Sequence, residues 1–130
     1  ERIRPVPGAG RQVVMTAPHD VPTAAQLVEA VREWLERDVA AATEGRLKFH
    51  ARVAANVLAM VERELDLGGA QATAHAARLA QLGVPDDAAL AAAIRRHEFD
   101  DRLDEVRELL LSSVIDKLLV ANPGYLSGAG

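Results

Sequence analysis

Apolar residues recur at helical spacing along most of the chain, and the first such run begins near Thr23. Thr23 and Gln26 have the spacing of a capping box, in which each side chain bonds the backbone of the other. Leu27 and Val31 then follow at intervals of three to four residues. This pattern predicts a first helix over residues 23–43.

A second helix is predicted over residues 46–67, where Gly68-Gly69 is expected to act as the C-cap. At 100° per residue, its apolar arc is centred on His50. The arc contains Leu47, Val53, Ala54, Val57, Leu58, Val61 and Leu65, and the opposite face carries Lys48, Ala55, Ala59, Glu62 and Asp66. Because the arc is wide, we expect neighbouring helices to cover it on several sides.

Three further helices are expected over residues 70–82, 87–96 and 101–121. Gly83 ends the first of them, and an Asp cap opens the second. Asn122-Pro123-Gly124 ends the third, because proline disfavours helix at the preceding residue. The sequence therefore predicts an all-α fold, a single-domain helical bundle of about five helices.

The last predicted helix is apolar almost all round beyond Val114, with only Asp116 and Lys117 charged. Such a helix has to be covered on most sides. It is expected to lie at the centre of the bundle or to form a self-associating surface, and we expect a dimer.

The chain ends differ from this pattern. Residues 1–21 are rich in proline and glycine and are interpreted as an extended arm, and Met15 is a plausible natural start. Residues 1–14 are then an upstream segment without function, or an arm that docks on a neighbouring subunit. Residues 22–126 form the predicted bundle domain, and residues 127–130 a flexible tail.

Composition and charge narrow the classes of function. The net charge is −4, only 3% of residues are aromatic, and the basic residues are not clustered, which disfavours nucleic-acid binding. The absence of cysteine excludes disulfides and thiolate chemistry. No apolar run of about 18 residues and no signal peptide is visible, so we expect a cytoplasmic protein without membrane association. The preference for Arg over Lys is weakly indicative of a GC-rich bacterial genome.

The strongest candidate for a functional site is Arg46, His50, Arg52 and Asn56 on the second predicted helix. A neutral His beside a cation could serve as a base, and Arg52 with Asn56 could hold a carboxylate or a phosphate. In the simpler interpretation, His50 is a core histidine and the other side chains pair with neighbouring helices.

Other polar residues give weaker signals. Lys117 is expected to extend past its apolar stripe to solvent, although a buried Lys could be a nucleophile. His75 and His97 are expected at the surface. The acidic cluster could attract a divalent cation but is typical of a solvated helix start; it comprises Glu98, Asp100, Asp101, Asp104 and Glu105. No catalytic or nucleotide-binding motif is present, and no cofactor, metal or catalytic residue is expected.

Three segments, PTAAQLVEAVREWLERDV, EGRLKFHARVAANVLAMVERELDLG and DKLLVANPGYL, resemble an uncharacterised family of small all-helical bacterial proteins. The resemblance covers about residues 21–126, and the distinctive motif of the family maps onto Gly45, Arg46, Phe49, His50, Arg52, Asn56 and Asn122-Pro123. It implies genes encoded beside aminoglycoside-phosphotransferase-like kinases and acyl-CoA dehydrogenases, and it assigns no catalytic residue.

These observations favour a non-enzymatic accessory protein that associates with a kinase-like or acyl-CoA-metabolising enzyme. The alternative is a small-molecule-binding protein or enzyme with a pocket at Arg46, His50, Arg52 and Asn56.

Overall fold

A computed structural model describes residues 18 and 20–128, and these residues form helices and turns without any strand. The all-α fold class is therefore confirmed. Most of the predicted arm, with Met15, and the last two residues of the predicted tail lie outside the described residues. The chain divides into two compact units, the first ending at Asp66 and the second beginning at Leu67.

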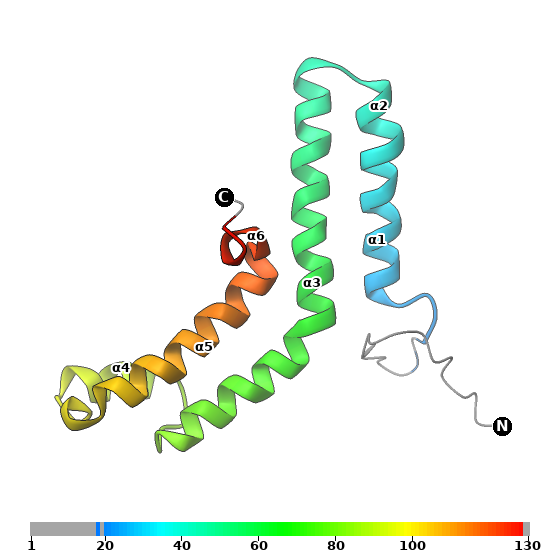
Figure 1. Ribbon diagram of the computed structural model, residues 1–130. Helices are drawn as coiled ribbons and strands as arrows, with labels where there is room; N and C mark the ends of the chain where they lie inside the picture. Colours follow the sequence, from blue (N-terminus) through cyan, green and yellow to red (C-terminus); the bar gives the residue numbers. More distant parts are fainter. Residues whose placement is uncertain (1–17, 19, 129–130) are drawn as a thin grey trace. The chain divides into compact units, whose positions relative to one another are not determined.

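The first unit is a helical hairpin (Figure 1). Helix α1 spans Ala24–Trp34 and continues through a π-helical segment, η1 (Leu35–Val39), into α2 (Ala40–Ala42). The capping box is confirmed: the Gln26 backbone N–H donates to Thr23 Oγ1 at 3.2 Å, and the Thr23 N–H donates to Gln26 Oε1 at 2.9 Å. Helix α3 (Gly45–Gln81) supplies the second arm of the hairpin with its first part.

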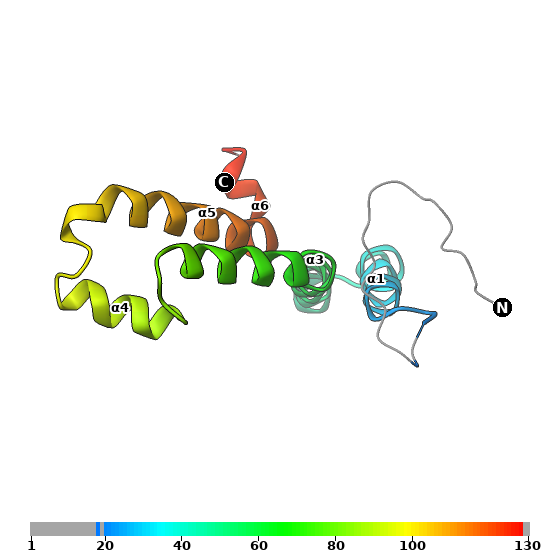
Figure 2. The same cartoon turned by 90° about the horizontal axis from the view of Figure 1, so that it is seen from below.

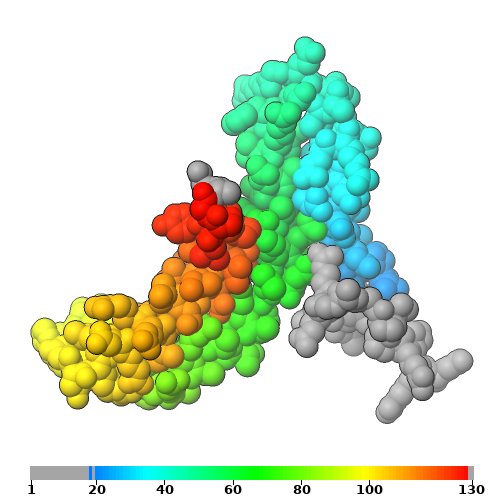
Figure 3. Space-filling model, in the orientation of Figure 1, coloured from blue at the N-terminus to red at the C-terminus, as the bar shows by residue number. Residues whose placement is uncertain are grey.

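Small residues and one ion pair form the contact between the two arms, whose side chains meet in Figure 3. Ala40, Ala51 and Ala55 are buried, and Glu62, only 6% exposed, accepts a hydrogen bond from Arg32. The prediction of which face of α3 packs is thus wrong, because the buried face is the one that carries Ala55 and Glu62. Small side chains let two helix axes approach closely, and the enclosed Glu62 carboxylate needs the Arg32 cation as its partner because burial removes its hydration.

The apolar arc predicted to be covered lies instead at the surface. Leu47 is 68% exposed and Val57 is 52% exposed, and Val61 and Leu65 are each more than a third exposed. His50, at the centre of this arc, is exposed and is not a core histidine.

The predicted helix end at Gly68-Gly69 is also wrong, because α3 continues through both glycines to Gln81 and joins two predicted helices into one. The end at Gly83 is confirmed. Gly83 has φ +76°, and the N–H groups of Gly83 and Val84 donate to the carbonyls of Ala80 and Leu79 at 3.0 and 3.1 Å. These two bonds are the Schellman arrangement, which needs a left-handed residue at this position.

In the second unit, the end of α3 is followed by α4 (Asp87–Arg95), a 3₁₀ turn η2 (Asp100–Arg102), α5 (Leu103–Ala121) and the short α6 (Pro123–Leu126). Figure 2 shows the later part of α3 alongside α5. The predicted Asp cap of α4 is confirmed, since Asp86 Oδ1 accepts from the Ala89 N–H at 2.7 Å. Helix α5 ends before Asn122-Pro123 as predicted, and Pro123 begins α6.

The core of this unit is formed by larger side chains than that of the hairpin. Its buried members are Leu79, Leu82, Leu90, Ala93, Phe99 and Val106. Only the N-terminal half of α5 contributes to it. In the apolar C-terminal half, Val114, Ile115 and Leu119 are exposed, so the prediction that neighbouring helices of this chain bury it is wrong for the described residues.

Candidate functional site

Arg46 and His50, two of the four predicted site residues, are brought together on the exposed side of α3. The Arg46 Nε–H donates to His50 Nε2 at 3.3 Å, and the Phe49 ring lies edge-on to the imidazole with a centroid separation of 5.6 Å. Because Nε2 accepts this bond, the proton of a neutral His50 lies on Nδ1. The pair is open to solvent on the first turns of the helix.

Arg52 and Asn56, the other two, are exposed on a different side of the same helix. Six residues separate Arg52 from Arg46, which corresponds to a rotation of about 120° around the helix axis. The structure therefore brings Arg46 and His50 together but places Arg52 and Asn56 on another side of the helix. The cavities described below lie on α5 and η2, and neither includes any of the four residues.

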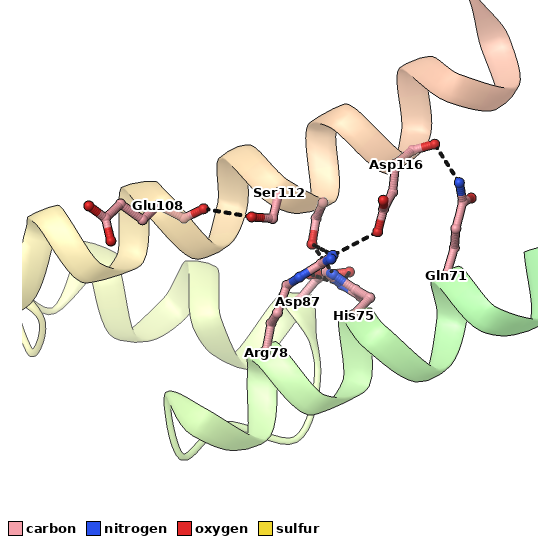
Figure 4. Close-up of polar contacts among 8 residues, drawn as sticks. Gln71, His75, Arg78, Asp87, Glu108, Ser112 and Asp116 are labelled. Carbon is pink, nitrogen blue, oxygen red and sulfur yellow. Dashed lines mark hydrogen bonds and ion pairs between the residues drawn. The ribbon is translucent and has the colours of Figure 1, made fainter. Parts of the chain in front are cut away.

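A polar cluster that the sequence did not predict lies between α3, α4 and α5 (Figure 4). Its members are Gln71, His75, Arg78, Asp87, Ser113 and Asp116. All six belong to the second unit.

The hydrogen bonds of this cluster have a definite direction. Asp87 only accepts, so His75 Nε2 carries a proton and donates to its two carboxylate oxygens at 2.9 and 3.1 Å. Arg78 Nη1 only donates, and it lies 2.9 Å from Ser113 Oγ and 2.9 Å from Asp116 Oδ2. The Ser113 hydroxyl is therefore left to donate to Nδ1 of a neutral His75, at 2.8 Å.

A serine, a histidine and a carboxylate in hydrogen-bond contact form the pattern of an activated nucleophile. Here, however, Ser113 Oγ also accepts from Arg78, whose cation is held by Asp116. Ser113 lies on the side of α5 that packs against α3, and neither described cavity includes it. The arrangement acts as a clasp between helices, with Gln71 adding a bond to the Asp116 carbonyl at 2.8 Å.

His75 was expected at the surface, yet its side chain is only 31% exposed and both ring nitrogens are bonded. The sequence contains only part of the signal that would have predicted this cluster. His75 and Arg78 are three residues apart, as are Ser113 and Asp116, so each pair lies on one face of its helix. The sequence does not show that the two faces meet.

Three members of the acidic cluster, Glu98, Asp104 and Glu105, pair with arginines, and Asp100 pairs with His97. A shallow cavity of about 460 Å³ lies at the start of α5. Hydrogen bonds from Arg96 and Arg102 lower the pKa of Glu98 and of Glu105, respectively. The same bonds raise the pKa of both arginines. Among the described residues, no group of three or more His, Asp or Glu side chains could hold a metal ion.

A second, apolar hollow of about 410 Å³ lies along α5. It is lined by Leu103, Val106, Arg107, Leu110, Leu111 and Val114. Lys117, one turn beyond Val114, is exposed as predicted. Within the described part of the chain, no helix is long and apolar enough to span a membrane.

Comparison with known proteins identifies one related family. No curated protein and no solved structure matches the chain. The family model described as "Domain of unknown function (DUF6285)" matches residues 41–125, a range that includes α3, the clasp and α5. Because the match covers more than half of the chain, the protein belongs to this family.

Proposed function

We propose that this protein is a non-enzymatic accessory protein, and that it associates with a kinase-like or acyl-CoA-metabolising enzyme encoded near it in a bacterial genome. The observation that supports this proposal is the uncovered apolar surface of α5. Leu103, Leu111 and Val114 are each about half exposed and line one hollow of about 410 Å³.

An exposed apolar patch of this kind is typical of an interaction site. A hollow bordered by Leu and Val side chains suits an aliphatic or aromatic anchor residue from a partner protein. Arg107 at its edge adds a charge that would select an acidic neighbour of that anchor.

The polar residues of the second unit are consistent with this role. His75 bonds both Ser113 and Asp87 between helices, and neither described cavity includes any of the three residues. These polar side chains therefore hold the helices of the second unit together, and the apolar surface of α5 is available to bind a partner.

The test is co-expression of the tagged chain with each neighbouring enzyme, followed by co-purification. We expect one of the enzymes to be retained and Leu111→Asp to abolish retention. Arg37→Asp is the matched control, because Arg37 is highly exposed and belongs to the hairpin of the first unit, whereas α5 belongs to the second. Loss of retention in both variants, or no retention by the wild-type chain, would contradict the proposal.

A further inference from the structure

The hairpin of the first unit carries a second uncovered apolar surface, here called the hairpin face. It comprises Leu27, Val31 and Trp34 of α1 with Leu47, Val57, Val61 and Leu65 of α3, all exposed to solvent. None of the buried apolar residues of this unit is larger than alanine. The large side chains that normally hold helices together are therefore outside the contact between α1 and α3.

The two apolar stripes lie on the same side of the hairpin. On α3 the stripe is displaced by about 100° from the buried face around Ala55, and on α1 by about 135° from Arg32, which faces α3. On both helices this rotation about the helix axis has the sense in which residue numbers decrease. Because the arms are antiparallel, the same sense of rotation directs both stripes to one side of the pair.

Arg46 and Glu64, two opposite charges, border this face on α3. They are about five helical turns apart, so they lie on one line along the outer edge of the face, about 27 Å from each other. Both are exposed. In a second copy placed antiparallel, each Arg46 lies over the partner's Glu64.

The midpoint between the two charges falls at the level of Ala55, which is buried against α1, and its neighbour Ala54 lies on the apolar arc. A small residue at the crossing point lets two helices approach closely. The hairpin is thus self-complementary about this point, as a two-fold interface requires.

The face is long enough on α3 to hold a second copy. It is about 27 Å long on α3 and about 10 Å long on α1, and each helix is about 10 Å wide, so the projected area is roughly 370 Å². This is about half of the roughly 800 Å² per partner of a standard interface, so the charge pairs at its edge have to add to the apolar contact. Two hairpins stacked on this face would form a four-helix bundle.

We infer that the protein forms a homodimer through the hairpin face, with the two copies of α3 antiparallel and Arg46 paired with the partner's Glu64. This inference does not depend on the proposed function, which concerns α5 in the other unit.

The test is sedimentation equilibrium of the full chain and of charge-reversed variants. We expect the wild-type chain to be dimeric. We expect Arg46→Glu or Glu64→Arg alone to weaken the dimer about tenfold or more, because symmetry makes each substitution place like charges together twice. The double variant Arg46→Glu/Glu64→Arg restores both pairs and should restore the dimer.

Two controls make the result specific. Arg52→Glu reverses a charge on the same helix but away from the hairpin face and should leave the dimer intact. Val57→Asp should give a monomer that circular dichroism shows to be helical. A wild-type monomer at all concentrations, or a double variant no better than the single ones, overturns the inference. An intact dimer in Val57→Asp also overturns it and assigns dimerisation to another surface.

Discussion

Removing the buried carboxylate of Glu62 should destabilise the hairpin strongly. Breaking a fully buried ion pair by deleting one partner costs about 3–5 kcal/mol, because the remaining charge is left unpaired. Glu62 is almost completely enclosed, but the Arg32 side chain is 20% exposed and also bonds Glu36 at 3.0 Å. Since solvent and Glu36 still stabilise the cation, we expect Glu62→Ala to cost about 2–3 kcal/mol.

The single tryptophan gives a local assay for this loss. Trp34 is the only tryptophan of the chain and lies at the end of α1, so its fluorescence reports on the hairpin. Urea unfolding of wild-type and variant, at one protein concentration, gives the difference in free energy of unfolding. Glu33→Ala is the matched control, since Glu33 pairs with the highly exposed Arg37 at 3.7 Å and its loss should cost less than about 0.5 kcal/mol. Equal costs in the two variants would refute the conclusion that Glu62 holds α1 against α3.

Three further predictions concern the second unit. His97 has φ +62° after the end of α4, a conformation that suits glycine, so His97→Gly should stabilise the protein by about 0.5–1 kcal/mol in thermal unfolding; a loss of stability would contradict the strain argument. The pKa values of Glu98 and Glu105 in the folded state lie below the ordinary 4.5, so their pairing stabilises the fold above that pH. That stability should be lost as the pH falls through the folded-state values, as an acid titration of the melting temperature would show. Arg78→Met removes two bonds to α5 and should cost about 1–3 kcal/mol by circular dichroism; a cost near zero would show that the clasp does not stabilise the unit.

The helix boundaries could be predicted wherever two local signals agreed. Asp86 provides both a cap and a turn before α4, and Gly83 is followed by Val84-Pro85, which cannot continue a helix. Gly68-Gly69 has no such second signal, because Ala70 and Gln71 are good helix formers and no capping residue follows. Two glycines cost about 2 kcal/mol within a helix, and uninterrupted backbone bonds on both sides offset this cost.

The packing face of α3 could not be predicted from hydrophobicity alone. An apolar arc shows which side avoids water, but it does not show whether this chain or another molecule covers that side. The informative signal was the spacing of Ala51 and Ala55, one turn apart, with Glu62 two turns further along the same face. That pattern of small residues indicates a close helix contact. The clasp was missed for a different reason, because the residues that meet in it come from three separate helices.

In both units polar side chains connect helices, while some large apolar side chains remain exposed. The pair Arg32–Glu62 and the clasp around Arg78 connect helices within a unit, and such bonds restrict which helix faces can meet. Large apolar side chains such as Leu47 and Leu111 lie outside these contacts. Because burying apolar surface is the main driving force for association, each unit retains its strongest binding surface after its own helices have packed. A scaffold of this kind gains stability from whatever covers it, so dimerisation and enzyme binding should each raise the melting temperature in a concentration-dependent way.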